Sequence, residues 1–143
     1  MTALTDPLAE GAVQAVLEAG KLLADPAAVR SIRAKSETDY VTNVDLAVQA
    51  FLRERLAALA PDVQFMGEEQ DNSALDLTRP CWILDPVDGT TNLIHQFQHS
   101  AISLALAEGG QIVFGVVYNP YTEECFTARR GGGALRNGVP IHV

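Results

Sequence analysis

Residues 82–93 read WILDPVDGTTNL, an apolar run that meets two aspartates, a proline, a glycine and two threonines. The apolar residues 81–84 predict a buried strand, and Asp85 follows where that strand ends. Pro86 fixes φ and argues against simple continuation of the strand. A turn here can aim the Asp85 and Asp88 carboxylates, with the Val87 carbonyl, at one point. Such oxygen ligands suit a hard cation, Mg²⁺ first and Ca²⁺ or Mn²⁺ next.

The residues that follow favour an anion beside that cation. Gly89 permits close approach of the backbone to a ligand. Thr90 and Thr91 fall in the first turn of a short helix predicted over residues 89–95, where free N–H groups and the helix dipole favour a phosphate. A second interpretation stays open, because Asp-Pro and Asp-Gly are common turn formers and Asp88 can simply cap a helix.

A second pair of acids follows another predicted strand. Residues 63–66 form a short apolar run, and Gly67, Glu68 and Glu69 come directly after it. If this strand lies beside the strand over 81–84, its end faces the same site. Glu68 is then the better candidate ligand, whereas Glu69 also fits a solvated surface acid.

Other polar residues have equally ordinary interpretations. Thr42 and Asp45 fit a capping box, with Thr42 as the N-cap, about as well as they fit a functional role. Lys35 is a solvated lysine by default, and His95 closes the predicted short helix near the site. No serine or cysteine lies in a nucleophile motif such as G-x-S-x-G, so the expected nucleophile is a metal-activated water.

Composition limits the classes of function. The chain has 143 residues, 48% of them hydrophobic, which fits one compact domain. A net charge of −8 argues against nucleic acid as a partner, although an acidic protein can bind an anion through metal ions. The sequence shows no membrane-spanning run and no signal peptide, and its two cysteines have no metal spacing. We therefore expect a cytoplasmic protein without membrane contact.

The hydrophobic pattern predicts an α+β fold. Helices are expected over residues 4–24 and 43–60, with irregular polar segments over 29–41 and 70–79. Strands are expected over 101–107, 112–118 and 123–128, separated by turns at 108–110 and 119–122. Glycines at 131–133 and the Asn137-Gly138 pair punctuate the remainder. Two helices followed by a meander predict helices that cover one face of an antiparallel sheet.

These motifs, in this order, resemble the inositol monophosphatase family of Mg²⁺-dependent, Li⁺-sensitive phosphatases. The resemblance rests on four pieces and covers nearly the whole chain from Lys35. They are Lys35 with DYVTNVD at 39–45, GEE at 67–69, the stretch at 82–93, and FGVVYNP at 114–120. TNLIH at 91–95 is more similar to the inositol monophosphatase branch than to adenosine 3′,5′-bisphosphate phosphatases, which more often carry a lysine at the Thr91 position.

The resemblance implies a two-metal site. Glu68, Asp85 and the Val87 carbonyl would hold the first Mg²⁺, and Asp85 with Asp88 the second. One metal would make a nucleophile of a water, and the other would stabilise the leaving oxygen. Glu68 and Thr90 would position that water.

The resemblance also implies roles around the phosphate. Asp45 would hydrogen-bond Thr90 as part of the catalytic group. Asp88 and the amides of Gly89 and Thr90 would contact the phosphate. Lys35 would lie on a mobile loop near it. Glu69 and Thr91 would lie in the outer shell.

The implied reaction is hydrolysis of inositol monophosphate or a related polyol phosphate. Fructose 1,6-bisphosphate, a nucleotide bisphosphate and histidinol phosphate remain alternative substrates. Family members are considerably longer and form homodimers, and residues 1–143 resemble the N-terminal metal- and phosphate-binding half of their αβαβα sandwich. The second half carries a further aspartate for the second metal, often after a tryptophan. A non-catalytic metal- or phosphate-binding module therefore remains the alternative if the protein ends at Val143.

Overall fold

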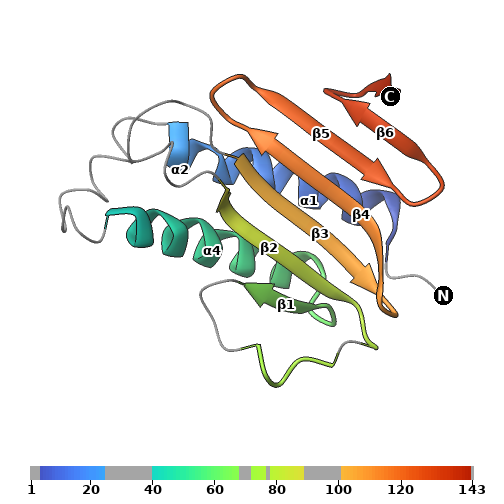
Figure 1. The fold of residues 1–143 in the computed structure, drawn as a ribbon. Helices are drawn as coiled ribbons and strands as arrows, with labels where there is room; N and C mark the ends of the chain where they lie inside the picture. Colours follow the sequence, from blue (N-terminus) through green and yellow to red (C-terminus); the bar gives the residue numbers. More distant parts are fainter. Residues whose placement is uncertain (1–3, 25–39, 68–71, 77, 89–100, 143) are drawn as a thin grey trace.

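The computed structural model describes residues 4–24, 40–67, 72–76, 78–88 and 101–142. Two long helices lie on one face of a seven-stranded sheet, so the α+β architecture is confirmed (Figure 1). The helices are α1 (Asp6–Ala19), α2 (Lys21–Ala24) and α4 (Tyr40–Leu59). The strands are β1 (Gln64–Gly67), β2 (Cys81–Asp88), β3 (Ala101–Glu108), β4 (Gln111–Asn119), β5 (Glu124–Arg129), β6 (Gly133–Arg136) and β7 (Val139–Ile141).

Helix α1 begins at a conventional N-cap. The Thr5 side chain accepts a hydrogen bond from the Leu8 N–H at 3.2 Å. The helix ends at Gly20, where Tyr118 of β4 approaches so closely that an added Cβ would lie 2.5 Å from its ring. The single helix predicted over 4–24 is therefore two helices, α1 and α2.

Helix α4 begins earlier than the sequence predicted. It starts at Tyr40, so Thr42 already has helical backbone and lies inside the helix. An N-cap residue has non-helical backbone, so of the two interpretations left open for Thr42 and Asp45 the capping box does not hold. Among the residues described, no helix is long and apolar enough to cross a membrane.

The strands follow one another across the sheet in chain order, from β1 to β7. Strands β2 to β5 pair antiparallel in sequence, as predicted, and β6 and β7 continue the same pattern. Strands β1 and β2 are instead parallel, so the sheet is mixed rather than antiparallel. A parallel pair needs a long connection, and residues 68–80 supply it.

Strand β2 continues past Pro86, against the prediction that it ends at Leu84. Its pairing with β3 is irregular between Asp85 and Asp88. A proline is tolerated within a sheet at such a bulge, because the local ladder is already interrupted.

The core lies between the helices and one face of the sheet. Ile102, Leu104 and Leu106 alternate along β3 and are at most 1% exposed. They belong to a cluster with residues of both long helices and of β2 and β4, including Val16, Val48, Leu52, Trp82, Leu84 and Val116. Cys81 is buried and Cys125 half-buried, and both are free thiols whose pKa is raised by burial.

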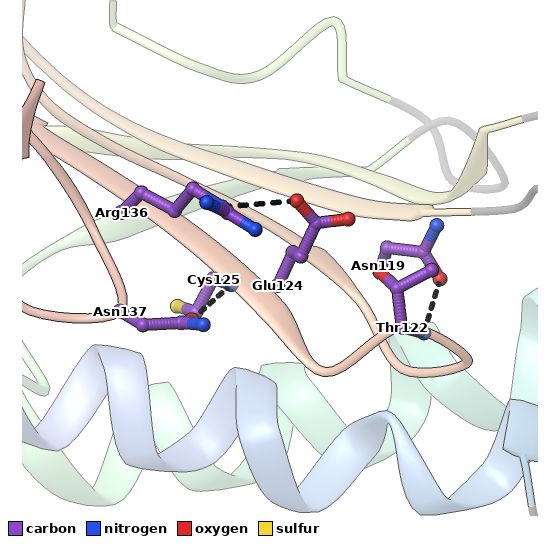
Figure 2. Close-up of polar contacts among 6 residues, drawn as sticks. All are labelled: Asn119, Thr122, Glu124, Cys125, Arg136 and Asn137. Carbon is purple, nitrogen blue, oxygen red and sulfur yellow. Dashed lines mark hydrogen bonds and ion pairs between the residues drawn. The ribbon is translucent and has the colours of Figure 1, made fainter.

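The hairpin of β6 and β7 was not predicted. Asn137 and Gly138 join its strands with φ of 50° and 82°, as a two-residue turn of this kind requires. The Asn137 side chain also accepts a hydrogen bond from the Cys125 N–H at 2.8 Å, which fixes the turn against β5 (Figure 2). An ion pair of 3.0 Å between Arg136 and Glu124 joins β6 to β5.

Candidate active site

The end of β1 lies beside the middle of β2. In their parallel register Gly67, the last residue of β1, pairs with Leu84, and β2 continues past it to Asp88. Glu68 is bonded to Gly67, and Asp85 follows Leu84. The condition on which the sequence hypothesis depended, that these two strands are neighbours, is therefore confirmed.

A bulge in β2 gives Asp85 and Asp88 register positions on the same face of the sheet. Asp85 pairs with Ser103 and Asp88 with Ala101, so the step of three residues on β2 matches a step of two on β3. Residues two apart on a regular strand belong to the same face of a sheet. The register positions of Asp85 and Asp88 therefore share one face, whereas an unbulged strand would put residues three apart on opposite faces.

The beginning of α4 lies at the same end of the sheet, although α4 packs on the face of Ile102 and Leu104 and not on that of Ser103, the partner of Asp85. Helix α4 packs on β2 and runs opposite to β1 and β2, so its first turns are on the side where those strands end (Figure 1). Asp45 is in this part of the helix. It precedes Gln49 by one turn, and the Gln49 side chain lies against Gly67.

Sequence reasoning did not single out Gln49, Asn72 or Ser103. Gln49 is a polar residue at an apolar helix position, on the face of the buried Leu52 and Leu56. That break in the hydrophobic stripe was the available signal. Asn72 and Ser103 gave no such signal in the sequence. Ser103 is brought to Asp85 by the pairing of β2 with β3, and Asn72 is brought to Gly67 by the path of the loop after β1.

Several predicted site residues lie outside the described residues. They are Lys35, Glu68, Glu69, Gly89, Thr90, Thr91 and His95. For Asp45, Val87 and Asp88 the structure describes the backbone and not the side chain. Among described side chains no three acidic, histidine or cysteine residues are grouped closely enough to hold a metal ion. The ligand set and the role of each residue therefore remain predictions.

The loop that returns from β1 to β2 is tied to β1 at two points. Asn72 donates a hydrogen bond to the Gly67 carbonyl at 2.9 Å. Gln64 exchanges two hydrogen bonds with the Asp76 backbone, at 2.7 and 2.8 Å. The Thr78 hydroxyl and N–H both donate to the Asp76 carboxylate, and these bonds lower its pKa. These contacts close the described parts of the loop against the start and the end of β1.

The fold is shared with solved phosphatase structures. An inositol monophosphatase from Anabaena superposes with a TM-score of 0.80 at 31% identity, over 94% of this chain and 48% of that one. A second protein, the staphylococcal SaIMPase-II, is 30% identical. Its structure with inositol monophosphate bound has a TM-score of 0.69 over 90% of this chain and 45% of that one. It has also been solved with 2′AMP bound, with a TM-score of 0.74 over 90% of this chain and 47% of that one.

Sequence comparison gives the family. A sequence model of the Inositol monophosphatase family matches residues 4–143, and this chain belongs to that family. The inositol-1-monophosphatase of Rhizobium meliloti is 44% identical over 134 residues, which are 92% of this chain and 50% of that protein. The chain thus spans about half the length of the curated relatives that it matches.

Proposed function

We propose that this chain forms the metal- and phosphate-binding half of a Mg²⁺-dependent phosphatase that hydrolyses inositol monophosphate or a related polyol phosphate. The proposal rests on the parallel register of β1 and β2. In it Gly67, the residue before Glu68, pairs with Leu84, the residue before Asp85. Family membership and the inositol monophosphate bound to the staphylococcal relative support the choice of substrate.

The donor chemistry fits a hard divalent cation. Asp85 is half-buried within β2, just past the end of β1, and the bulge gives Asp85 and Asp88 register positions on one face. Glu68, Asp85, Asp88 and the Val87 carbonyl would supply only oxygen ligands, which Mg²⁺ prefers. Bound Mg²⁺ would lower the pKa of a water and neutralise charge on the phosphoryl group.

The protein groups would then orient the reaction. Glu68 and Thr90 would hold the attacking water, with Asp45 hydrogen-bonded to Thr90. The Gly89 and Thr90 amides would bind phosphate oxygens at the start of a helix. Lys35 would add positive charge near the phosphate, and Glu69 and Thr91 would support the ligands from outside. The position of Asp45, one turn before Gln49 on α4, is consistent with this arrangement.

The remaining properties follow the family resemblance as proposals. We propose inhibition by Li⁺, a homodimer in the form that carries the second half, and a cytoplasmic location. Residues 1–143 would be one domain, completed by that second half.

A nucleotide phosphate is a second candidate substrate, because the staphylococcal relative also binds 2′AMP. Hydrolysis rates for inositol 1-phosphate and 2′AMP, measured on the same protein that includes the second half, separate the two. A higher kcat/KM for 2′AMP would replace the first choice of substrate and leave the metal site intact.

The proposed metal site is tested by Asp85→Asn. We expect calorimetric titration to show Mg²⁺ binding at least about tenfold weaker. Loss of a group that only orients a metal ligand already weakens binding by about that factor, and loss of the ligand itself should weaken it no less. Asp62→Asn is the matched control, since it makes the same charge change at an exposed position before β1. Equal Mg²⁺ affinity in wild type and Asp85→Asn would refute the assignment.

A further inference from the structure

Gln49 is the one polar side chain in the core among the residues described. It lies on α4 beside the fully buried Val48 and is itself only 7% exposed. A buried amide is costly unless it is hydrogen-bonded, so a polar side chain at such a position calls for an explanation. Its contact with the end of β1 gives one.

The Gln49 amide lies against the backbone of Gly67. A Cβ added to Gly67 would lie 2.6 Å from Gln49 Oε1, 2.7 Å from its Cδ and 3.0 Å from the Phe65 ring. Only a residue without a side chain allows this approach. Gly67 is therefore needed for its lack of bulk, and its neighbour Gln49 fills the space.

Asn72 holds the same residue from the loop. Its side-chain amide donates a hydrogen bond to the Gly67 carbonyl at 2.9 Å. That carbonyl belongs to the peptide group that joins Gly67 to Glu68. Two amide side chains thus contact Gly67: Gln49 from α4 packs against it, and Asn72 from the loop after β1 donates a hydrogen bond to its carbonyl.

We propose that Gln49 and Asn72 are positioning residues that fix the Gly67 backbone and thereby aim Glu68 at the metal. The inference rests on the proposed function for the role of Glu68. It adds that contacts from α4 and from the loop after β1 determine the direction of the backbone at Gly67, and through it the position of the Glu68 carboxylate. Both side chains are neutral, so they contact the backbone without adding charge beside the acids.

The chemistry explains why such support matters. A carboxylate binds Mg²⁺ well only if its backbone already directs it, since Mg²⁺ demands near-ideal octahedral geometry. Loss of groups that orient a ligand typically weakens metal binding by about 10- to 100-fold. The effect should therefore appear in Mg²⁺ affinity rather than in overall stability.

The test compares Gln49→Leu and Asn72→Ala with a matched core variant, Val48→Ala. Leucine keeps most of the buried volume of glutamine and removes the amide. Val48→Ala makes a cavity on the adjacent helix position without touching Gly67. Each protein is measured by calorimetric Mg²⁺ titration, by thermal unfolding, and by amide hydrogen exchange of peptides that cover residues 67–72 without metal.

We expect Gln49→Leu and Asn72→Ala to bind Mg²⁺ about tenfold more weakly and to exchange faster over residues 67–72. Val48→Ala should lower the Tm but keep wild-type affinity and wild-type exchange in that segment. Asn72→Ala keeps the test valid if Gln49→Leu fails to fold, because Asn72 lies outside the core.

The outcomes separate this inference from the proposed function. If Asp85→Asn weakens Mg²⁺ binding while Gln49→Leu and Asn72→Ala leave affinity and exchange unchanged, the positioning role is overturned and the metal site stands. If Asp85→Asn has no effect, the proposed metal site fails. The metal-free exchange rates then still decide whether Gln49 and Asn72 hold the Gly67 backbone.

Discussion

Glu18 and Arg55 connect the two long helices at the scale of single residues. The Arg55 guanidinium donates a hydrogen bond to the Glu18 carboxylate, and it also lies 5.4 Å from the centroid of the Phe51 ring. The hydrogen bond from Arg55 is the main reason that the pKa of Glu18 is lowered from its ordinary value of 4.5. The pair is partly exposed, so its contribution to stability is modest.

The sign of the shift makes a pH prediction. A carboxyl whose pKa is lower in the folded state stabilises the protein above its unfolded pKa, and this stabilisation disappears as pH falls through the folded value. Glu18→Gln should therefore be slightly less stable than wild type at pH 7. The difference should shrink as pH falls below about 4.5.

Urea denaturation at several pH values measures this difference. Glu54→Gln is the control, because it makes the same change of charge at an exposed position on the same helix as Arg55. A Glu18→Gln difference that grows as the solution is acidified would contradict the assignment.

At the scale of elements, the contact between Gly20 and Tyr118 joins the helix layer to β4. Gly20 has ordinary helical backbone, with φ of −57°, so alanine is not strained there and should even favour the helix by up to about 1 kcal/mol. The added Cβ would nevertheless lie 2.5 Å from the Tyr118 ring and 3.1 Å from Pro120. The steric clash with Tyr118 should therefore outweigh the gain in helix propensity.

We expect Gly20→Ala to lower the free energy of unfolding by about 1–3 kcal/mol, the usual cost of overpacking. The midpoint of denaturant unfolding at unchanged m-value measures it. Gly115→Ala on β4 is the matched control, because the nearest atom to its added Cβ is 4.0 Å away. If both variants lose the same stability, close packing at Gly20 is not the cause.

Element type was easier to predict than element pairing. Alternation along residues 101–107 and helical spacing over 43–60 identified β3 and α4, because burial acts directly on those periods. Strand direction was not predictable for β1 and β2, since alternation is the same in parallel and antiparallel pairs. The β6–β7 hairpin was missed although Asn137-Gly138 is a hairpin signal, because its strands are short and mostly exposed.

The site was predicted in the same uneven way. Asp85 and Glu68 were singled out because each acid follows an apolar strand, and the register of β1 and β2 supports that reasoning. The bulge that gives Asp85 and Asp88 a shared face depends on pairing with β3, far along the chain. Gln49 and Asn72 were missed for the same reason, since their importance comes from a tertiary contact with Gly67.

At the scale of the whole molecule, the sheet is covered on one face. The described helices pack on the face that carries Ile102 and Leu104. The opposite face presents Val117, Phe126 and Ile141, which are 41%, 37% and 39% exposed. Val117 and Phe126 are paired across β4 and β5, so they form a continuous apolar surface. A surface of this kind favours association or a covering layer.

We therefore predict that the 143-residue chain alone is a poor catalyst even where it binds Mg²⁺. Its Asp85 and Asp88 would leave the second metal with few protein ligands, and the substrate would lack contacts from the second half. Joining the second half of the Rhizobium meliloti relative after Val143 should raise kcat/KM for inositol 1-phosphate by about 10²-fold or more, because the substrate is then held in a fixed geometry.

The control for this comparison is the same fusion with Asp85→Asn, which should lose the gain in activity if the first half supplies the metal site. Light scattering on the two unmutated proteins should show that the fusion stops at a dimer whereas the 143-residue chain forms larger assemblies, because the second half would cover the surface around Val117 and Phe126. Comparable kcat/KM for the chain and the fusion would mean that these 143 residues already hold a complete site. The second half would then contribute cover for the sheet rather than catalytic groups.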